Sequence, residues 1–130
     1  ELIDTKRAPK LMQQSAVQAL GLLATLGADY HDEVVETLVN ISKKSKDRHQ
    51  RSLGMIALGQ WGVVTNSLSS ERVLIEEALV DRLRKAQTYQ KGWAAIGLAV
   101  LSAGLNAKGD RVDQKVLDTL HQSFKRGRNS

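Results

Sequence analysis

The chain has 130 residues, a formal net charge of +5 and no cysteine, so disulfides and thiolate metal sites are excluded. Apolar residues make up 42% of the chain, but aromatic residues only 4%, and there is one proline. A length that fits one domain with this composition predicts an aliphatic, all-α core without strands. No apolar run reaches the 18 residues that a membrane span needs. Because the first residue is Glu1, we expect a segment of a longer chain.

The tripeptide Ala-Leu-Gly recurs along the chain with a period of 38 residues. It stands at 19–21 and 57–59, and returns as Ala-Ile-Gly at 95–97. A fixed period of this size is typical of repeat arrays. We therefore predict three helix-turn-helix units, at about 9–45, 46–86 and 87–126, which stack into a short right-handed α-solenoid.

In the first unit, Pro9 suits the first turn of a helix that runs to about Leu26 and ends at Gly27. Its expected apolar stripe consists of Leu11, Ala16, Val17, Leu20, Leu23 and Ala24. Asp32 is a suitable N-cap for the second helix, which ends at Lys43-Lys44.

In the second unit, Asp47 and Gln50 have the spacing of a capping box and predict the start of a third helix. This helix is expected to end near Trp61-Gly62. The longer loop 63–70 follows, with Ser69 or Ser70 as the cap of the fourth helix.

In the third unit, Thr88 opens the fifth helix, which runs to Gly104, and Asp110 is the expected cap of the sixth. The expected stripe of the fifth helix is Trp93, Ile96, Val100 and Leu101. That of the sixth is Val112, Val116, Leu117, Leu120 and Phe124.

Gly21, Gly59 and Gly97 lie inside the predicted first helices of the units. A glycine inside a helix costs about 1 kcal/mol relative to alanine, so these positions need a reason. They follow no strand and open no phosphate-binding loop. We interpret them as packing residues that let neighbouring helices approach closely.

The segment 34–62 resembles a HEAT repeat, especially the HEAT-like repeat of phycobilin lyases, through Asp47, Arg51, Gly54 and the Ala57-Leu58-Gly59 run. The resemblance implies a non-catalytic scaffold without a cofactor that binds another protein over its second helices. It also implies that the Asp caps the helix and that the Arg bonds to neighbouring turns in a ladder.

The other two units depart from this pattern. The first has Pro9 and Gln13 at the equivalent positions, and the third has Lys85 and Tyr89, so we expect the ladder to be broken at both ends. A tetratricopeptide fold is the second choice, because Trp93-x-x-Ile96-Gly97 mimics its opening. The period argues against it, because that family repeats about every 34 residues.

Basic residues concentrate where the second helix of each unit ends. This predicts a basic ridge along one edge, consisting of Lys43, Lys44, Lys46, Arg48, Arg82, Arg84, Lys85, Lys125, Arg126 and Arg128. Cations also favour helix C-termini through the macrodipole, so solubility alone is one interpretation. The other is contact with the phosphates of a nucleic acid or with another polyanion.

The sequence predicts no catalytic or metal site and no small-molecule substrate. His31, His49 and His121 fall in different contexts without ligands at metal spacing. Trp61, Tyr89, Trp93 and Asp47 suggest the pocket of a HEAT-like DNA glycosylase, but core packing explains Trp93 better. The location is left open, with the cytoplasm favoured.

Overall fold

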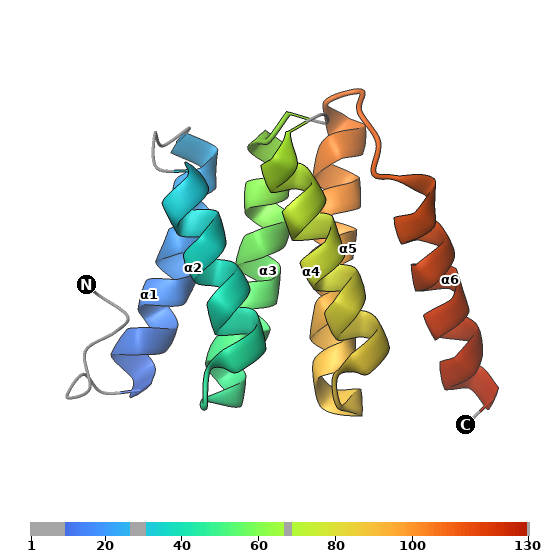
Figure 1. Ribbon diagram of the computed structural model, residues 1–130, viewed down its shortest axis with the longest axis horizontal. Helices are drawn as coiled ribbons and strands as arrows, with labels where there is room; N and C mark the ends of the chain where they lie inside the picture. Colours follow the sequence, from blue (N-terminus) through green and yellow to red (C-terminus); the bar gives the residue numbers. More distant parts are fainter. Residues whose placement is uncertain (1–9, 27–30, 67–68, 130) are drawn as a thin grey trace.

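The computed structural model describes residues 10–26, 31–66 and 69–129, and every regular element in these ranges is helical. Six α-helices and one 3-10 turn follow each other along the chain (Figure 1). Their bounds are α1 (Lys10–Leu22), the 3-10 turn Leu23–Leu26, α2 (His31–Lys44), α3 (Arg48–Val64), α4 (Ser70–Lys85), α5 (Thr88–Ala107) and α6 (Gln114–Asn129). The expected all-α class is confirmed.

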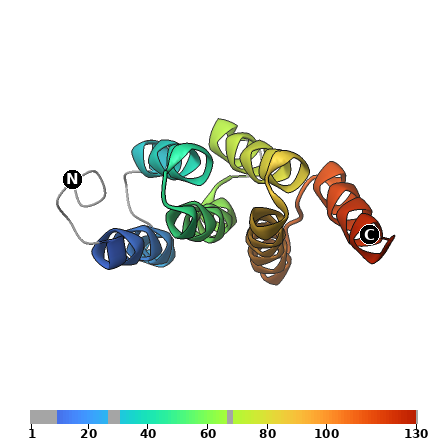
Figure 2. The same cartoon turned by 90° about the horizontal axis from the view of Figure 1, so that it is seen from below.

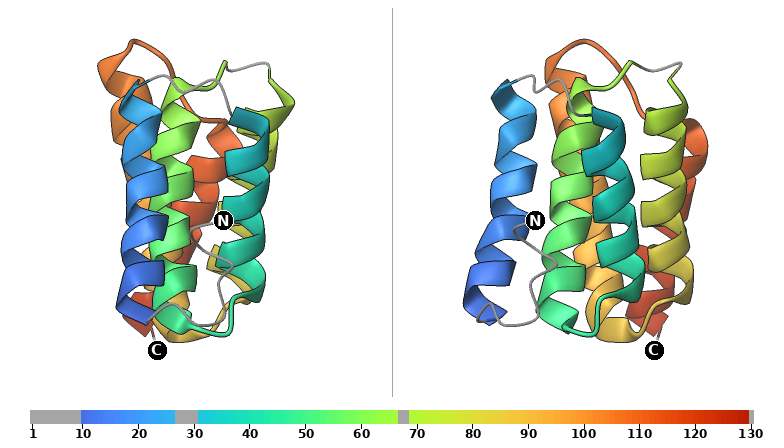
Figure 3. Two further views of the ribbon diagram at one scale, coloured as in Figure 1. Left: turned by 90° about the vertical axis from the view of Figure 1, so that its left-hand side faces the viewer. Right: turned by 60° about the vertical axis from the view of Figure 1, so that its left-hand side comes forward.

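The helices form two layers (Figure 2). In the first layer α1 packs on α3 and α3 packs on α5, while α2, α4 and α6 follow one another in the second. Seen from the side of the molecule where the chain begins, α1, α2 and α3 lie side by side (Figure 3). Along the chain, each first-layer helix is followed by a second-layer helix.

The central element is α3, which contacts α1, α2, α4 and α5. None of its residues from Gln50 to Val64 is exposed. Trp61 is completely buried, and its Nε1 donates a hydrogen bond to the Leu20 carbonyl of α1 at 2.6 Å. The core therefore gathers around α3 rather than around an aromatic cluster.

Glycines allow the helices of the first layer to approach each other closely. A Cβ atom added at Gly59 would overlap the backbone carbonyl of Gly97, and one added at Gly97 would lie 2.5 Å from the carbonyl oxygen of Met55. A Cβ at Gly21 would lie 2.9 Å from that of Ala57. Backbone atoms cannot move aside as a flexible side chain can. The repeated glycine thus sits at each helix crossing in this layer.

The predicted helix caps are partly right. Asp47 caps α3 by accepting a hydrogen bond from the His49 amide at 3.1 Å, and Ser69 caps α4 by accepting one from Arg72 at 3.1 Å. The prediction for Asp110 is wrong, because α6 begins at Gln114. Asp113 lies directly before it and accepts a hydrogen bond from the Lys115 amide at 2.9 Å.

Other predicted boundaries shift by a few residues. Asp32 lies inside the first turn of α2, which begins at His31, and α3 continues to Val64. Pro9 and Gly27 lie outside the described residues.

The predicted stripe of α5 is only partly right. Leu101 is buried and Trp93 packs partly buried against the core, but Ile96 is 45% exposed and Val100 is half-buried. The close approach at Gly97 fixes which side of α5 faces α3, and Leu98 and Leu105 are buried in place of Ile96 and Val100. In α1, Leu11 is exposed for a related reason, because Val17 and Gly21 face α3 instead.

Replacing Gly59 by alanine tests the close approach. We expect Gly59→Ala to lower the free energy of unfolding by about 1–3 kcal/mol, because the new methyl group overpacks a backbone crossing. Gly92→Ala is the matched control, since a Cβ at this exposed helical position meets nothing within 4 Å. It should raise stability by about 0.5–1 kcal/mol. Urea unfolding measures both, and equal effects of the two changes would contradict the packing role.

Candidate binding surfaces

The C-terminal ends of α2, α4 and α6 lie along one edge of the molecule, together with the starts of α3 and α5 (Figure 1). We call the cations at this edge the basic edge, which consists of Lys43, Lys44, Lys46, Arg48, Arg82, Arg84, Lys85 and Lys125. All of them except Arg82 are exposed. The side chains of Arg126 and Arg128 lie outside the described residues.

Part of this charge is neutralised locally. Arg82 lies 3.0 Å from Asp81, and Lys85 lies 3.1 Å from the same carboxylate. Burial by itself raises the pKa of Asp81, but the hydrogen bonds from Arg82 and Lys85 outweigh it and lower the pKa below its ordinary value. Within the described residues the other cations of the basic edge form no ion pair, and four of them, Lys43, Lys44, Lys46 and Arg48, lie at or beside the turn between α2 and α3.

Arg48 connects this turn to α5. Its guanidinium lies over the ring of Tyr89, 5.1 Å from the ring centre, in a cation–π contact. Tyr89 is thus held on the surface by Arg48 at the start of α5. An aromatic ring and cations on one edge are features shared by surfaces that bind nucleic acids.

A chain of polar contacts crosses the first layer near the same edge. Asp47 accepts a hydrogen bond from Gln14 Nε2 of α1 at 2.9 Å. Arg51 donates to the carbonyl of Ser45. With the Gln90 amide turned so that its oxygen faces Arg51, the guanidinium also donates to α5, from Nη2 at 3.0 Å.

The Asp47–Arg51 pair therefore reaches both neighbouring helices of the first layer. On both sides the partner side chain is a glutamine, Gln14 of α1 and Gln90 of α5. Burial by itself raises the pKa of Asp47, and the hydrogen bonds from Gln14 and the His49 amide lower it below its ordinary value.

Arg72 is almost completely buried, and it was not among the residues predicted from the sequence. Its Nε donates to Thr65 Oγ1 at 2.9 Å, and its Nη2 donates to the Thr65 carbonyl at 2.6 Å and lies 3.4 Å from Asp110. A hydrogen bond from the Arg111 amide, together with Arg72, lowers the pKa of Asp110. Arg72 and Asp110 are 38 residues apart, which equals the glycine period, and this spacing is the sequence signal that could have indicated their contact.

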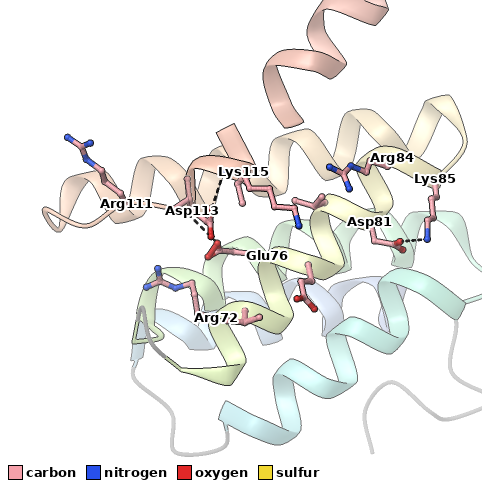
Figure 4. A pocket seen from close by; sticks show the side chains of 13 residues that line it. Arg72, Glu76, Asp81, Arg84, Lys85, Arg111, Asp113 and Lys115 are labelled. Atoms are coloured by element: carbon pink, nitrogen blue, oxygen red, sulfur yellow. Dashed lines mark hydrogen bonds and ion pairs between the residues drawn. The ribbon is translucent and has the colours of Figure 1, made fainter. Parts of the chain in front are cut away.

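A cleft of about 530 Å³ lies between α4 and α6. Buried Val80, Val112 and Val116 are among its lining residues, and charged side chains surround it. Figure 4 shows carboxylates of Glu76 and Asp81 on the α4 side. The cleft thus combines an apolar surface with charges of both signs.

Glu76 links the two sides of the cleft through a hydrogen bond. Its Oε2 accepts a hydrogen bond from the Asp113 amide at 3.4 Å, which joins α4 to the start of α6. Burial raises the pKa of Glu76 above its ordinary value, despite this hydrogen bond and the nearby charge of Arg72. Lys115 extends along the other side of the cleft (Figure 4), and no ion pair is formed by Lys115 within the described ranges.

The structure does not bring together the residues of the glycosylase hypothesis. Asp47 caps the start of α3, whereas Trp61 lies fourteen residues further along the same helix, a distance of about 20 Å at 1.5 Å per residue. Trp61 is buried against Leu20, and Trp93 packs partly buried against the core. Of these three aromatic residues, only Tyr89 is exposed, and its contact with Arg48 places it near Asp47 at the start of α3.

The histidines lie in separate environments. The ring of His31 packs edge-on against Trp61 with centroids 5.0 Å apart, and its Nδ1 lies 3.8 Å from Glu71. His49 and His121 are exposed. Among the residues that the structure describes, no three His, Asp or Glu side chains are grouped to hold a metal ion.

No protein-family model, curated protein or solved structure matches the chain. Within the described part of the chain, no helix is both long and apolar enough to cross a membrane.

Because the pKa of Asp47 is lowered in the folded protein, its charge should affect how stability changes with pH. A carboxyl group whose pKa is lower in the folded state contributes stability above its unfolded pKa and loses it as the pH falls through the folded value. Asparagine keeps the helix cap but carries no charge. We expect Asp47→Asn to be less stable than wild type at pH 7 and to lose less stability between pH 5 and pH 2. Urea unfolding across this range measures it, and equal losses in both proteins would contradict the assignment.

Proposed function

We propose that this chain is a non-catalytic protein-interaction scaffold, built as a short right-handed α-solenoid of three HEAT-like units. The recurrent glycines at the crossings of α1, α3 and α5 support the repeat interpretation. The polar contacts that Asp47 and Arg51 make with both neighbouring helices support the HEAT-like one.

The observation that carries the proposal is the cleft between α4 and α6. It lies on the second-layer helices, where a HEAT-like protein is expected to hold its partner, and Val73 is 49% exposed at its border. Exposed apolar side chains beside charged groups are typical of protein-binding surfaces. The buried valines offer an apolar contact, and Lys115 and Arg84 offer cations to a carboxylate of the partner.

A photo-crosslinking residue at Val73 tests this proposal. A protein partner should crosslink from position 73 and not from Asn40, an exposed control position on α2. With the purified partner, Val73→Asp should weaken binding at least tenfold, about 1.4 kcal/mol, because it places a charge beside the apolar contact. Asn40→Asp should leave the affinity unchanged. Equal crosslinking from both positions, or a partner insensitive to Val73→Asp, would contradict the proposal.

The alternative function is binding of a nucleic acid or another polyanion along the basic edge. It is favoured by Lys43, Lys44 and Lys46, which lie between the end of α2 and the start of α3 and form no ion pair among the described residues. Helix N-termini carry partial positive charge and favour anions. Phosphate contacts release counterions, so binding through this edge falls steeply with salt, whereas binding through the apolar cleft does not. Salt dependence in the same binding assay therefore separates the two functions.

A further inference from the structure

The outward side of α1 is largely apolar, although the exposed polar residues Ser15 and Gln18 lie on the same side midway along the helix. Leu11 is 76% exposed, and Met12 and Leu22 are each 60% exposed. At 3.6 residues per turn these side chains and Ala19 lie on one face, opposite the buried Val17 and Gly21. After Lys10, α1 carries no charged residue. A helix that is apolar on both sides is normally covered on both sides.

The outward side of α5 has the same character at the other end of the first layer. Ile96, Ala99 and Ala103 are exposed and share one face, opposite the buried face that packs on α3. The exposed Tyr89 lies at the border of this face, where its ring also contacts Arg48 of α3. From Gly92 to Ala107, α5 carries no charged residue. We call these faces the α1 stripe (Leu11, Met12, Ala19, Leu22) and the α5 stripe (Tyr89, Ile96, Ala99, Ala103).

We propose that a second copy of this chain places its α1 stripe on the α5 stripe, head to tail, and so continues the first layer. The large side chains of the α1 stripe complement the small Ala99 and Ala103 of the α5 stripe. A contact between two different faces is heterologous, so it leaves one free stripe at each end and allows further copies to add. Apart from Arg111, which also lines the α4–α6 cleft, this association uses surfaces outside that cleft, and it goes beyond the proposed function.

Charge complementarity along the second layer favours a second copy as the occupant. At the start of α2, His31 lies 3.8 Å from Glu71 of the next helix of the layer. One step further, Arg72 at the start of α4 lies 3.4 Å from Asp110, which precedes α6. Each step therefore pairs a base of one unit with an acid of the next.

The third base in this series is Arg111. It points away from Glu76 and Asp113 in Figure 4, and within the described residues it forms no ion pair. The first unit carries the exposed acid Glu33 at the matching place, whereas the neighbouring Asp32 interacts with Glu71 of the same chain. In the head-to-tail arrangement, Arg111 of one copy meets Glu33 of the next copy and extends the series.

Sedimentation equilibrium of the purified chain over about 1–500 μM tests the proposal, a range suited to micromolar association. The average mass of wild type should rise above the monomer with concentration. Leu11→Lys disables the α1 stripe and Ile96→Lys disables the α5 stripe, so each variant alone should stay monomeric. An equimolar mixture of the two should form a 1:1 dimer and nothing larger, because only one intact pair of stripes is available.

Leu74→Lys is the matched control, since Leu74 is 41% exposed on α4, outside both stripes. It should associate like wild type, and circular dichroism should show native helix content in all variants. Arg111→Glu should weaken association at least tenfold, and mixing it with Glu33→Arg should restore association. A wild type that stays monomeric throughout, or an Ile96→Lys variant that still associates alone, would overturn the proposal.

Discussion

The close approach of α3 and α5 at Gly59 and Gly97 is the contact on which the rest of the structure depends. Neither position has room for a methyl group, because the opposing atoms belong to the backbone. The crossing fixes which side of each helix faces inward, and it brings Met55, Leu58 and Leu98 into one buried cluster. This explains how a chain with few aromatic residues forms a core, since short side chains and close backbones replace bulky ones.

Polar networks at the two edges fix how neighbouring helices are positioned along the layers. Asp47 and Arg51 connect three first-layer helices through glutamines, and Arg72 connects α4 to the segment before α6. Buried polar groups are costly unless they are paired, so a shift of one unit against the next would leave several of them without partners. The glycine crossings thus provide the packing, and the edge networks specify the alignment. The surfaces outside both features are the apolar stripes, the cleft and the basic edge.

Much of the helix order follows from local patterns in the sequence. The acceptor at Asp47 and the hydroxyl at Ser69 each act within a few residues of their own helix, and the glycine period marks the first-layer helices at a fixed spacing in the sequence. The side of α5 that is buried could not be predicted in this way, because Ile96 and Leu98 are equally apolar and only the contact with α3 separates them. The role of Asp110 was missed for a similar reason, since its partner Arg72 is distant in sequence and the actual cap, Asp113, lies three residues on. The basic ridge could be predicted in part. That its cations share one edge follows from their positions at helix ends, but the neutralisation of Arg82 and Lys85 by Asp81 depends on side-chain geometry.

Native-state hydrogen exchange, followed amide by amide, tests most directly whether α3 is the centre of the structure. Amides open with free energies that range up to that of global unfolding, and the most enclosed elements exchange slowest. The amides of α3 around Gly59 and those of α5 around Gly97 should exchange only on global unfolding. Those of α6, which packs mainly on α4, should exchange through smaller openings. If α3 exchanged as fast as α6, the central role of the glycine crossing would be contradicted.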